Sequence, residues 1–277
     1  MFKDTETKTH EGHVTDTRCR PDITAAFDRD WKDDGSTYWP LIRLAGEKAS
    51  GGKSLDTQKK NVASYLHYLL LARPDLHIAQ GLLLTRESEV MFLLGTGGVG
   101  IRECSLAWDH RDLYKLLCAF IYRLYKPGSF ADPSYTMTDF DREDCQASYT
   151  VHITVGTQTV DCPGFRPIYA KNPFATRTHV LSNPSSRVSV EGKVLTVLKD
   201  QLCRTGKRFD ELSMVDLVHR PRVPGVVEAV YGETIPTLGS SGRCRHRLGL
   251  QQSGSPFTSI PNPQKMLETL FDLLEGI

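Results

Sequence analysis

The 277-residue chain is predicted to be an α+β protein made of two units. In the first half, residues 57–72 place apolar side chains at helical spacing, and two short apolar runs of strand length follow. In the second half, Val194–Leu198 forms a β-branched run, and Phe209, Leu212, Val215 and Val218 then recur at helical spacing. The pattern therefore predicts helices and strands in both halves.

The first unit is expected over residues 21–126, after a disordered lead-in at 1–20. The expected helix at 57–72 presents Val62, Leu66, Leu69 and Leu70 on one face. Its other elements are a strand at 38–44, a loop at 46–54, strands at 78–84 and 90–94 joined as a hairpin, a strand at 101–106 and a helix at 111–124. A linker at 127–148 leads to the second unit at 149–277, which opens with a hairpin around Gly156.

The composition of the chain limits which partners and which cellular compartment are expected. The formal net charge of +1 provides no long-range field for nucleic acid or an anionic membrane. No apolar run approaches the roughly eighteen residues of a membrane helix, so no membrane span is expected. The 7 cysteines form no C-x-x-C pair, which favours a reduced, intracellular protein of the cytoplasm or nucleus, and no metal site is expected.

Two glycine motifs lack the context that nucleotide binding requires. Gly95, Gly97 and Gly100 have dinucleotide-motif spacing, but a strand is expected after them where the motif needs a helix. Gly46 and the Gly52-Lys53-Ser54 triplet are separated by five residues where a P-loop needs four. A turn and a flexible loop are the expected structures.

Lys199 and Glu211 are the candidate functional residues of the second unit. Lys199 ends the Val-Leu-Lys run and shares a strand face with Val197, while Glu211 shares a helix face with Val215 and Val218. A charge held against an apolar face needs a partner, because an unpaired buried charge costs several kcal/mol. An ion pair between Lys199 and Glu211 is one solution, and two solvated side chains are the alternative.

The second unit resembles the small lobe of the fungal-type protein kinases. The resemblance rests on Val197-Leu-Lys199-Asp, Arg208-x-x-Glu211 and Val223-Pro-Gly-Val226, in that order. It continues through Arg245-His-Arg-Leu248 and Gly254-Ser-Pro256 to residues 263–274, which are similar to the first helix of the large lobe. Upstream it includes Arg73-Pro-Asp-Leu-His77, Gly81-Leu-Leu-Leu84 and Phe130-Ala-Asp-Pro133, so that it covers most of residues 20–277.

The first unit resembles a metal-dependent nuclease fold, as the amino-terminal region of those kinases does. Arg20-Pro-Asp22, Glu47-Lys48 and Gln58 are similar to its Pro-Asp and Asp/Glu-x-Lys motif. The motif places carboxylate and lysine two residues apart on one strand face, whereas Glu47 and Lys48 are adjacent and should point to opposite faces. Gly46 stands where the second carboxylate should be. We therefore expect a degenerate nuclease-like unit.

The kinase resemblance implies transfer of phosphate from Mg-ATP to a protein Ser or Thr. It implies that Lys199 holds the ATP phosphates, that Glu211 orients Lys199, that Val197 lines the adenine site, and that Gln251 to Gly254 form the hinge.

Two departures from the family leave enzyme activity open. Residues 174–178, Phe-Ala-Thr-Arg-Thr, stand where the family has a glycine-rich turn. The H-R-D…N and D-F-G segments do not follow the small-lobe motifs, and the triplet His110-Arg111-Asp112 is expected to be a helix start. The expectation is a chain without catalysis and with weak or no ATP and magnesium binding. The alternative is a pseudokinase-like module that binds a protein partner through the helix at 263–274.

Overall fold

The computed structural model describes residues 2–5, 8–13, 19–49, 52–85, 89–183, 185, 188–205, 213–215, 228–236, 242–251, 262–265 and 267. The chain divides into two compact units. One contains residues 1–153 and 160–179, and the other contains 154–159 and 180–277. The coarse prediction of a mixed α and β protein is confirmed, with strands predominating over helices among the described residues.

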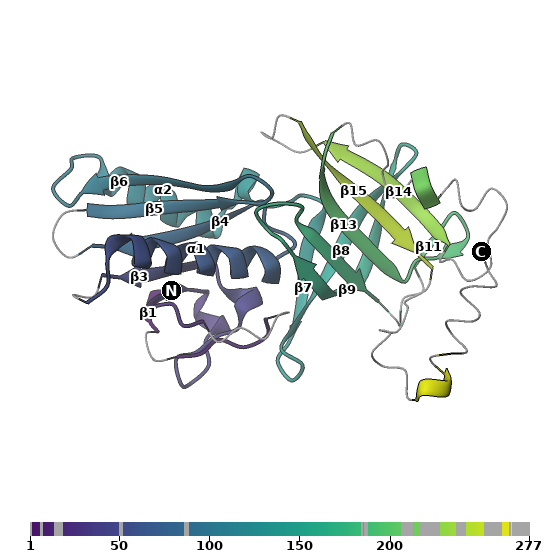
Figure 1. Cartoon of the computed structure of the whole chain (residues 1–277), viewed down its shortest axis with the longest axis horizontal. Helices are drawn as coiled ribbons and strands as arrows, with labels where there is room; N and C mark the ends of the chain where they lie inside the picture. Colours follow the sequence, from purple (N-terminus) through teal and green to yellow (C-terminus); the bar gives the residue numbers. More distant parts are fainter. Residues whose placement is uncertain are drawn as a thin grey trace. The chain divides into compact units, whose positions relative to one another are not determined.

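A six-stranded sheet forms the centre of the first unit (Figure 1). Its strands lie side by side in sequence order: β1 (Phe2–Asp4), β2 (Ile23–Ala25), β3 (Leu44–Lys48), β4 (Ile78–Leu84), β5 (Glu89–Thr96) and β6 (Gly100–Ala107). Neighbours are antiparallel except β3 and β4, which run parallel. The strands predicted at 78–84 and 90–94 are confirmed, and Gly97 and Gly98 lie in the turn between β5 and β6.

Helix α1 (Leu55–Ala72) makes the crossover that a parallel pair of strands requires. Ser54 caps its amino terminus, because the Ser54 hydroxyl accepts a hydrogen bond from the Thr57 N–H. The predicted apolar face is confirmed: Val62, Leu66, Leu69 and Leu70 are fully buried against the sheet.

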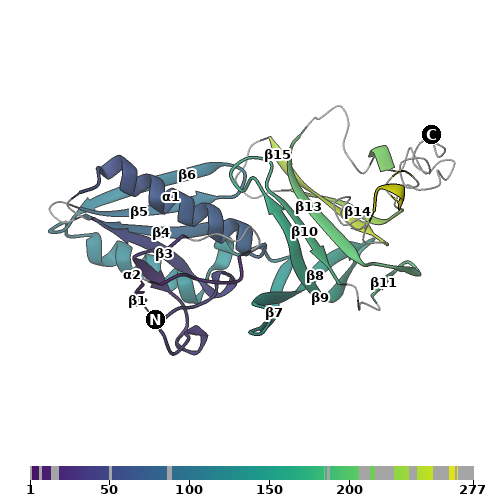
Figure 2. The ribbon, with the colours of Figure 1, turned by 60° about the horizontal axis from the view of Figure 1, so that its bottom comes forward.

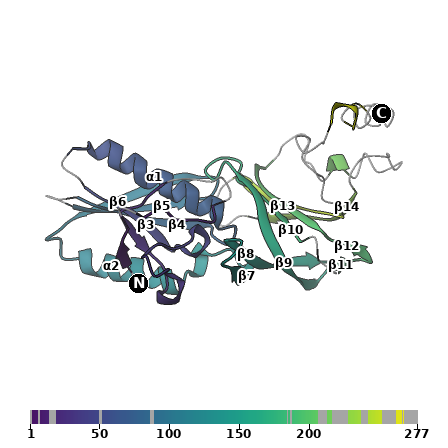
Figure 3. The ribbon, with the colours of Figure 1, turned by 90° about the horizontal axis from the view of Figure 1, so that it is seen from below.

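Helix α2 (Leu113–Tyr125) lies on the opposite face of the same sheet (Figure 3). Phe120 and Leu124 pack there against Leu82, Val90 and Phe92. The helix predicted at 111–124 is therefore confirmed over 113–124, but it begins two residues later than expected, and His110-Arg111-Asp112 precede it.

The predicted strand at 38–44 is wrong. Trp39–Leu41 form the short 3-10 helix η2, and β3 begins only at Leu44. Pro40 explains the difference, because proline has no N–H to donate to a sheet and favours the first turn of a helix. Trp39 is fully buried and packs against the carboxyl half of α1.

The amino-terminal residues are more ordered than the expected lead-in. Phe2–Asp4 pair with β2 as β1, and a second 3-10 helix, η1, spans Asp28–Asp30. His10 is 1% exposed and uses both ring nitrogens. The Thr37 N–H donates to its Nδ1 at 3.3 Å, and its Nε2 lies 3.1 Å from the Thr24 hydroxyl. Since Nδ1 is an acceptor here, His10 is neutral in the folded protein.

The expected linker at 127–148 contains secondary structure. It holds the 3-10 helix η3 (Gly128–Phe130), strand β7 (Tyr135–Asp141) and the start of β8 (Gln146–Val155). In β7, Tyr135 is buried and Thr136 is exposed, the alternation that a half-buried strand requires. The predicted hairpin around Gly156 is confirmed, and its second strand, β9 (Gln158–Lys171), is longer than expected.

A seven-stranded sheet has the order β14, β15, β13, β10, β9, β8, β7 (Figure 2). Its later strands are β10 (Thr178–Ser182), β13 (Val197–Arg204), β14 (Ala229–Pro236) and β15 (Arg243–Leu250). A separate two-stranded ribbon pairs β11 (Ser189–Val190) with β12 (Lys193–Val194). Between β13 and β15, Arg247 donates two hydrogen bonds of 2.7 Å to the buried Asp200.

A second buried ion pair follows the end of α1. Arg73 donates to both oxygens of Asp75, at 2.7 and 2.6 Å, and to the Ile42 carbonyl oxygen at 3.2 Å. Burial alone would raise the pKa of Asp75, but the adjacent Arg73 outweighs burial and holds that pKa below its ordinary value. The pair fixes the turn that connects α1 to β4.

Strand β6 is the outer strand of the first sheet. Among the described strands it pairs only with β5, and most of its side chains are exposed. Arg102 and Glu103 lie in its middle, and Glu103 forms an ion pair with Lys59 of α1 at 2.9 Å. Within the described residues, neither α-helix is both long and apolar enough to cross a membrane.

We expect His10 to make folding stability fall in mild acid. Burial lowers its pKa from about 6.5 to about 4. Between these values the unfolded chain binds a proton that the folded chain does not, so the unfolding free energy decreases as pH falls through this window. The full effect of a shift of this size is about 3 kcal/mol.

Urea unfolding at pH 7, 6, 5 and 4 measures this dependence. The His10→Asn variant should show a flatter slope, and the control His110→Asn, at an exposed histidine, should keep the wild-type slope. Equal slopes for His10→Asn and wild type would contradict the assignment.

Candidate functional site

Glu47, the candidate nuclease carboxylate, is buried and fully engaged by protein groups. It lies on β3 with 1% exposure. One carboxylate oxygen accepts hydrogen bonds from Lys53 at 3.2 Å and Asn61 at 2.8 Å, and the other accepts from the Tyr65 hydroxyl at 2.8 Å. Burial and this contact raise the pKa of Tyr65 well above its ordinary value, so Tyr65 remains a donor. Glu47 therefore holds β3 to α1.

Lys48 points to the other face of the sheet, as predicted for adjacent strand residues. Its ammonium group pairs with Asp4 of β1, and its backbone N–H donates to the Asp22 carboxylate at 2.9 Å. Asp22 and Lys48 both line a pocket on the α2 side. Gln58, the third residue of the nuclease resemblance, donates to the Lys53 carbonyl oxygen at 3.0 Å and supports the loop before α1.

Gly46 cannot be replaced by a carboxylate in this backbone. A Cβ added at Gly46 would lie 2.5 Å from the Leu82 carbonyl oxygen on β4. Among the described residues, no three His, Cys, Asp or Glu side chains are grouped so that they could hold a metal ion. The nuclease resemblance of this unit remains a prediction.

The pocket on the α2 side has a volume of about 490 Å³ and is mainly apolar. Its polar rim consists of Lys3, Asp4, Asp22 and Lys48. The apolar lining is Phe2, Ile23, Leu44, Leu82, Leu84, Val90, Trp108, Leu113, Leu117, Phe120 and Ile121. This size lies within the range of small-molecule sites, but Lys48 and Asp4 already pair with each other, and Asp22 already accepts the Lys48 N–H.

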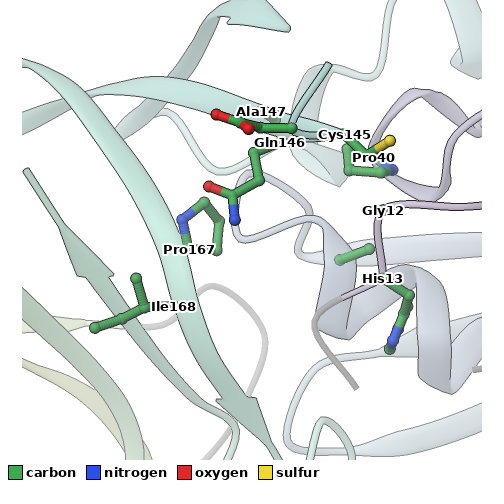
Figure 4. A pocket seen from close by; sticks show the side chains of 10 residues that line it. Gly12, His13, Pro40, Cys145, Gln146, Ala147, Pro167 and Ile168 are labelled. Atoms are coloured by element: carbon green, nitrogen blue, oxygen red, sulfur yellow. The ribbon is translucent and has the colours of Figure 1, made fainter. Parts of the chain in front are cut away.

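A second pocket, of about 330 Å³, brings His13 and Cys145 to one lining (Figure 4). The His13 Nε2 lies 3.0 Å from the Tyr68 carbonyl oxygen, and burial lowers the His13 pKa to about 4. The Cys145 thiol is 3.6 Å from a Glu11 carboxylate oxygen, and burial followed by this contact raises the Cys145 pKa. The imidazole thus contacts a backbone carbonyl oxygen, and the thiol contacts a carboxylate that keeps it protonated, so this pocket does not activate Cys145 as a nucleophile.

Lys199 and Val197, two of the residues that resemble a kinase site, lie on β13. The prediction that they belong to a strand is confirmed. Val197 is buried and Lys199 is half-buried. Asp200, the next residue, faces the opposite side and binds Arg247. Gln251 is exposed and directly follows β15, whereas Glu211 and Gly254 lie outside the described residues. The predicted Lys199–Glu211 pair and the complete hinge are therefore not seen.

The turn at 172–177, which the sequence comparison predicts in place of a glycine-rich phosphate loop, binds to the end of α1. The Arg177 guanidinium donates to three carbonyl oxygens: Leu70 at 3.3 Å, Arg73 at 2.9 Å, and Leu76. Phe174 packs on the α1 core, with its ring 5.9 Å from that of His67.

Backbone groups of this turn are also engaged. The Ala175 N–H donates to the Asn172 carbonyl oxygen at 3.1 Å, and the Pro173 carbonyl oxygen accepts from the Gly98 N–H at 2.7 Å. The sequence shows that this turn lacks glycine, but it does not predict that the turn attaches to α1.

Several polar contacts were not foreseen. Asn61 and Tyr65 follow Gln58 at helical spacing, a polar stripe that could have indicated a partner such as Glu47. On the exposed face of the second sheet, the Thr136 hydroxyl lies 2.9 Å from His152 Nε2, and His152 Nδ1 lies 2.8 Å from Asp161. These two hydrogen bonds link side chains of β7, β8 and β9.

Replacing Gly46 tests the close approach of β3 and β4. Gly46→Ala should lower the unfolding free energy by about 1–3 kcal/mol, because the new methyl group overlaps the Leu82 carbonyl oxygen. In the control Gly52→Ala, nothing lies within 4 Å of the added Cβ, so a change under about 0.5 kcal/mol is expected. Urea unfolding followed by tryptophan fluorescence measures both. Equal stability of the two variants would show that the strands can separate at no cost.

No protein-family model, no curated protein and no solved structure matches this chain. The resemblances to kinases and nucleases therefore remain predictions from the sequence.

Proposed function

We propose that this chain is a non-catalytic module of fungal-type protein kinase lineage, with a kinase-like small lobe that no longer holds ATP for phosphoryl transfer. The lineage part rests on the order of elements. A kinase small lobe has a phosphate-covering turn between two strands, followed by a strand that carries the ATP lysine. Here β9 and β10 are neighbours joined by residues 172–177, and β13 with Lys199 is next to β10 in the sheet.

The attachment of residues 172–177 to α1 is the observation that supports a loss of ATP binding. A phosphate-covering turn offers free backbone N–H groups and a flexible, glycine-rich backbone to the nucleotide. In this chain the Ala175 N–H is bonded within the turn, and Phe174 and Arg177 are engaged with α1. A turn held by its side chains in this way cannot close over phosphates without breaking those contacts.

Lys199 alone would bind a phosphate weakly. A half-buried ammonium group supplies one charge, and the energy of one ion pair near the surface is about 1 kcal/mol or less. Phosphoryl transfer additionally needs an aspartate beside the acceptor hydroxyl and carboxylates for magnesium. Asp112, from the only His-Arg-Asp triplet of the sequence, occupies the N-cap position of α2 without a side-chain capping hydrogen bond and pairs with Lys115 at 3.1 Å.

The proposed role is binding of a protein partner. The predicted contact is the helix at 263–274, of which the structure describes residues 263–265 and 267. Leu267 is 63% exposed, and the proposed contact surface rests on the helical spacing of Met266, Leu267, Leu270 and Leu274 in the sequence. The nuclease alternative would need manganese-dependent cleavage of plasmid DNA that Asp22→Ala abolishes, and the engagement of Glu47 argues against it.

Mg-ATP at millimolar concentration should leave the melting temperature of the chain unchanged. A ligand present at its Kd stabilises a protein by only about 0.4 kcal/mol, so an affinity of millimolar or weaker gives almost no shift. Thermal-shift assays with the wild type, Lys199→Ala and the control Lys193→Ala test this. A saturable shift that Lys199→Ala removes and Lys193→Ala retains would establish ATP binding and overturn the proposal.

Arg177→Ala should destabilise the chain by about 3 kcal/mol, because the helix-end carbonyl groups lose a charged donor. Arg166→Ala is the matched control, since Arg166 forms ion pairs at 3.3 and 3.4 Å with the partly exposed Asp144 and Asp141. Its loss should cost under about 1 kcal/mol. Urea unfolding reports both through the tryptophans at 31, 39 and 108. A small effect of Arg177→Ala would mean that the turn is not held by this contact.

A further inference from the structure

Two cysteines lie opposite each other on neighbouring strands of the second sheet, near the end of β13 and the start of β15. Cys203 on β13 pairs directly with Cys244 on β15 in the antiparallel register. Opposite residues of antiparallel strands project to the same face, with Cα atoms about 4.5 or 5.5 Å apart. Both spacings lie within the range that a disulfide can bridge, about 4.4–6.8 Å. In the structure both residues are free thiols, 5% and 7% exposed.

Each thiol has a polar neighbour on the same face. The Cys244 sulfur lies 3.1 Å from Nε2 of His246, two residues along β15. The Cys203 sulfur lies 3.4 Å from the amide oxygen of Gln201, two residues along β13. Gln201 and His246 are themselves opposite each other in the register. The four side chains therefore form one cluster.

His246 makes Cys244 the more reactive thiol of the pair. When Nε2 accepts the thiol hydrogen bond, the proton can pass to the imidazole and leave a thiolate, which is the nucleophilic form of cysteine. The other ring nitrogen, Nδ1, is buried and has no hydrogen-bond partner among the described residues, so Cys244 provides the hydrogen bond that holds this ring. Gln201 can accept a hydrogen bond from Cys203 but cannot take its proton.

We propose that Cys203 and Cys244 form a peroxide-oxidised thiol pair, with His246 as the base. The Cys244 thiol gives its proton to His246, and the thiolate attacks one oxygen of hydrogen peroxide. The O–O bond breaks, Cys244 becomes a sulfenic acid, and the departing hydroxide takes the proton from His246 to form water. The Cys203 sulfur then attacks the Cys244 sulfur, and the hydroxyl group leaves as a second water with the Cys203 proton. Two thiols thus lose two electrons to one peroxide.

The disulfide would join β13 to β15 and close a covalent loop over the residues between Cys203 and Cys244, which include β14. Closing a loop of this length restricts the unfolded chain and raises the stability of the unit that contains it. Lys199 lies on the same face of β13, four residues before Cys203, but the thiol chemistry does not depend on the proposed function.

Treatment of the reduced 277-residue chain with hydrogen peroxide tests the proposal. After blocking of remaining thiols and protease digestion, mass spectrometry should find a peptide pair linked through Cys203 and Cys244. The linked protein should melt at a higher temperature than the reduced one, and dithiothreitol should reverse the change. Cys162, fully buried on β9 with its sulfur 3.9 Å from the Val160 carbonyl oxygen, is the matched internal control and should remain a thiol.

Three variants separate the assigned roles. Cys203→Ser should stop the reaction at a sulfenic acid on Cys244, which dimedone traps, and Cys244→Ser should prevent both products. His246→Gln retains a hydrogen-bond acceptor without a base, and it should slow disulfide formation severalfold while circular dichroism shows an unchanged fold. Failure of the folded wild type to form the link would overturn the proposal. Oxidation of Cys162 at an equal rate, or an unchanged rate in His246→Gln, would overturn the role of His246.

Discussion

The contact between Arg177 and the end of α1 is the interaction on which the first unit depends most. The last carbonyl groups of a helix have no partner inside the helix and carry its partial negative charge. The last turn of α1 contains no basic residue, and Arg177, distant in sequence, supplies the charge to Leu70 and Arg73. The same guanidinium reaches Leu76 in the turn towards β4. One side chain therefore joins a helix end, the following turn and the start of β10.

Arg177 also fixes the conformation of the connection between β9 and β10, because its guanidinium binds the end of α1. The proposal compares this connection with a phosphate-covering turn, and its backbone and side chains stabilise the fold through Ala175, Pro173 and Phe174. Glu47 shows the same change of role in the first sheet: a carboxylate resembling a metal ligand binds Asn61 and Tyr65 of α1. In both cases residues that resemble catalytic parts hold elements together.

The sequence predicted elements whose signal is local and missed those that depend on distant contacts. Helix α1 and strands β4 and β5 follow directly from the spacing of their apolar residues. The strand expected around Trp39 failed because the aromatic and aliphatic composition outweighed the single proline that decides the local conformation. Opposite faces for Glu47 and Lys48 could be predicted from strand geometry, but the donors to Glu47 could not, because they depend on the face that α1 presents. The pairing of Cys203 with Cys244 likewise needs the strand register.

The outer strand β6 has a consequence for self-association. No described strand pairs with its far edge, and the backbone amide and carbonyl groups of an unpaired edge can bind a strand of another molecule. Arg102 and Glu103 oppose such stacking, since an incoming copy in register would bring like charges together and would compete with the Glu103 contact to Lys59. Within the described part of the chain, these charges therefore disfavour pairing of two copies through this edge.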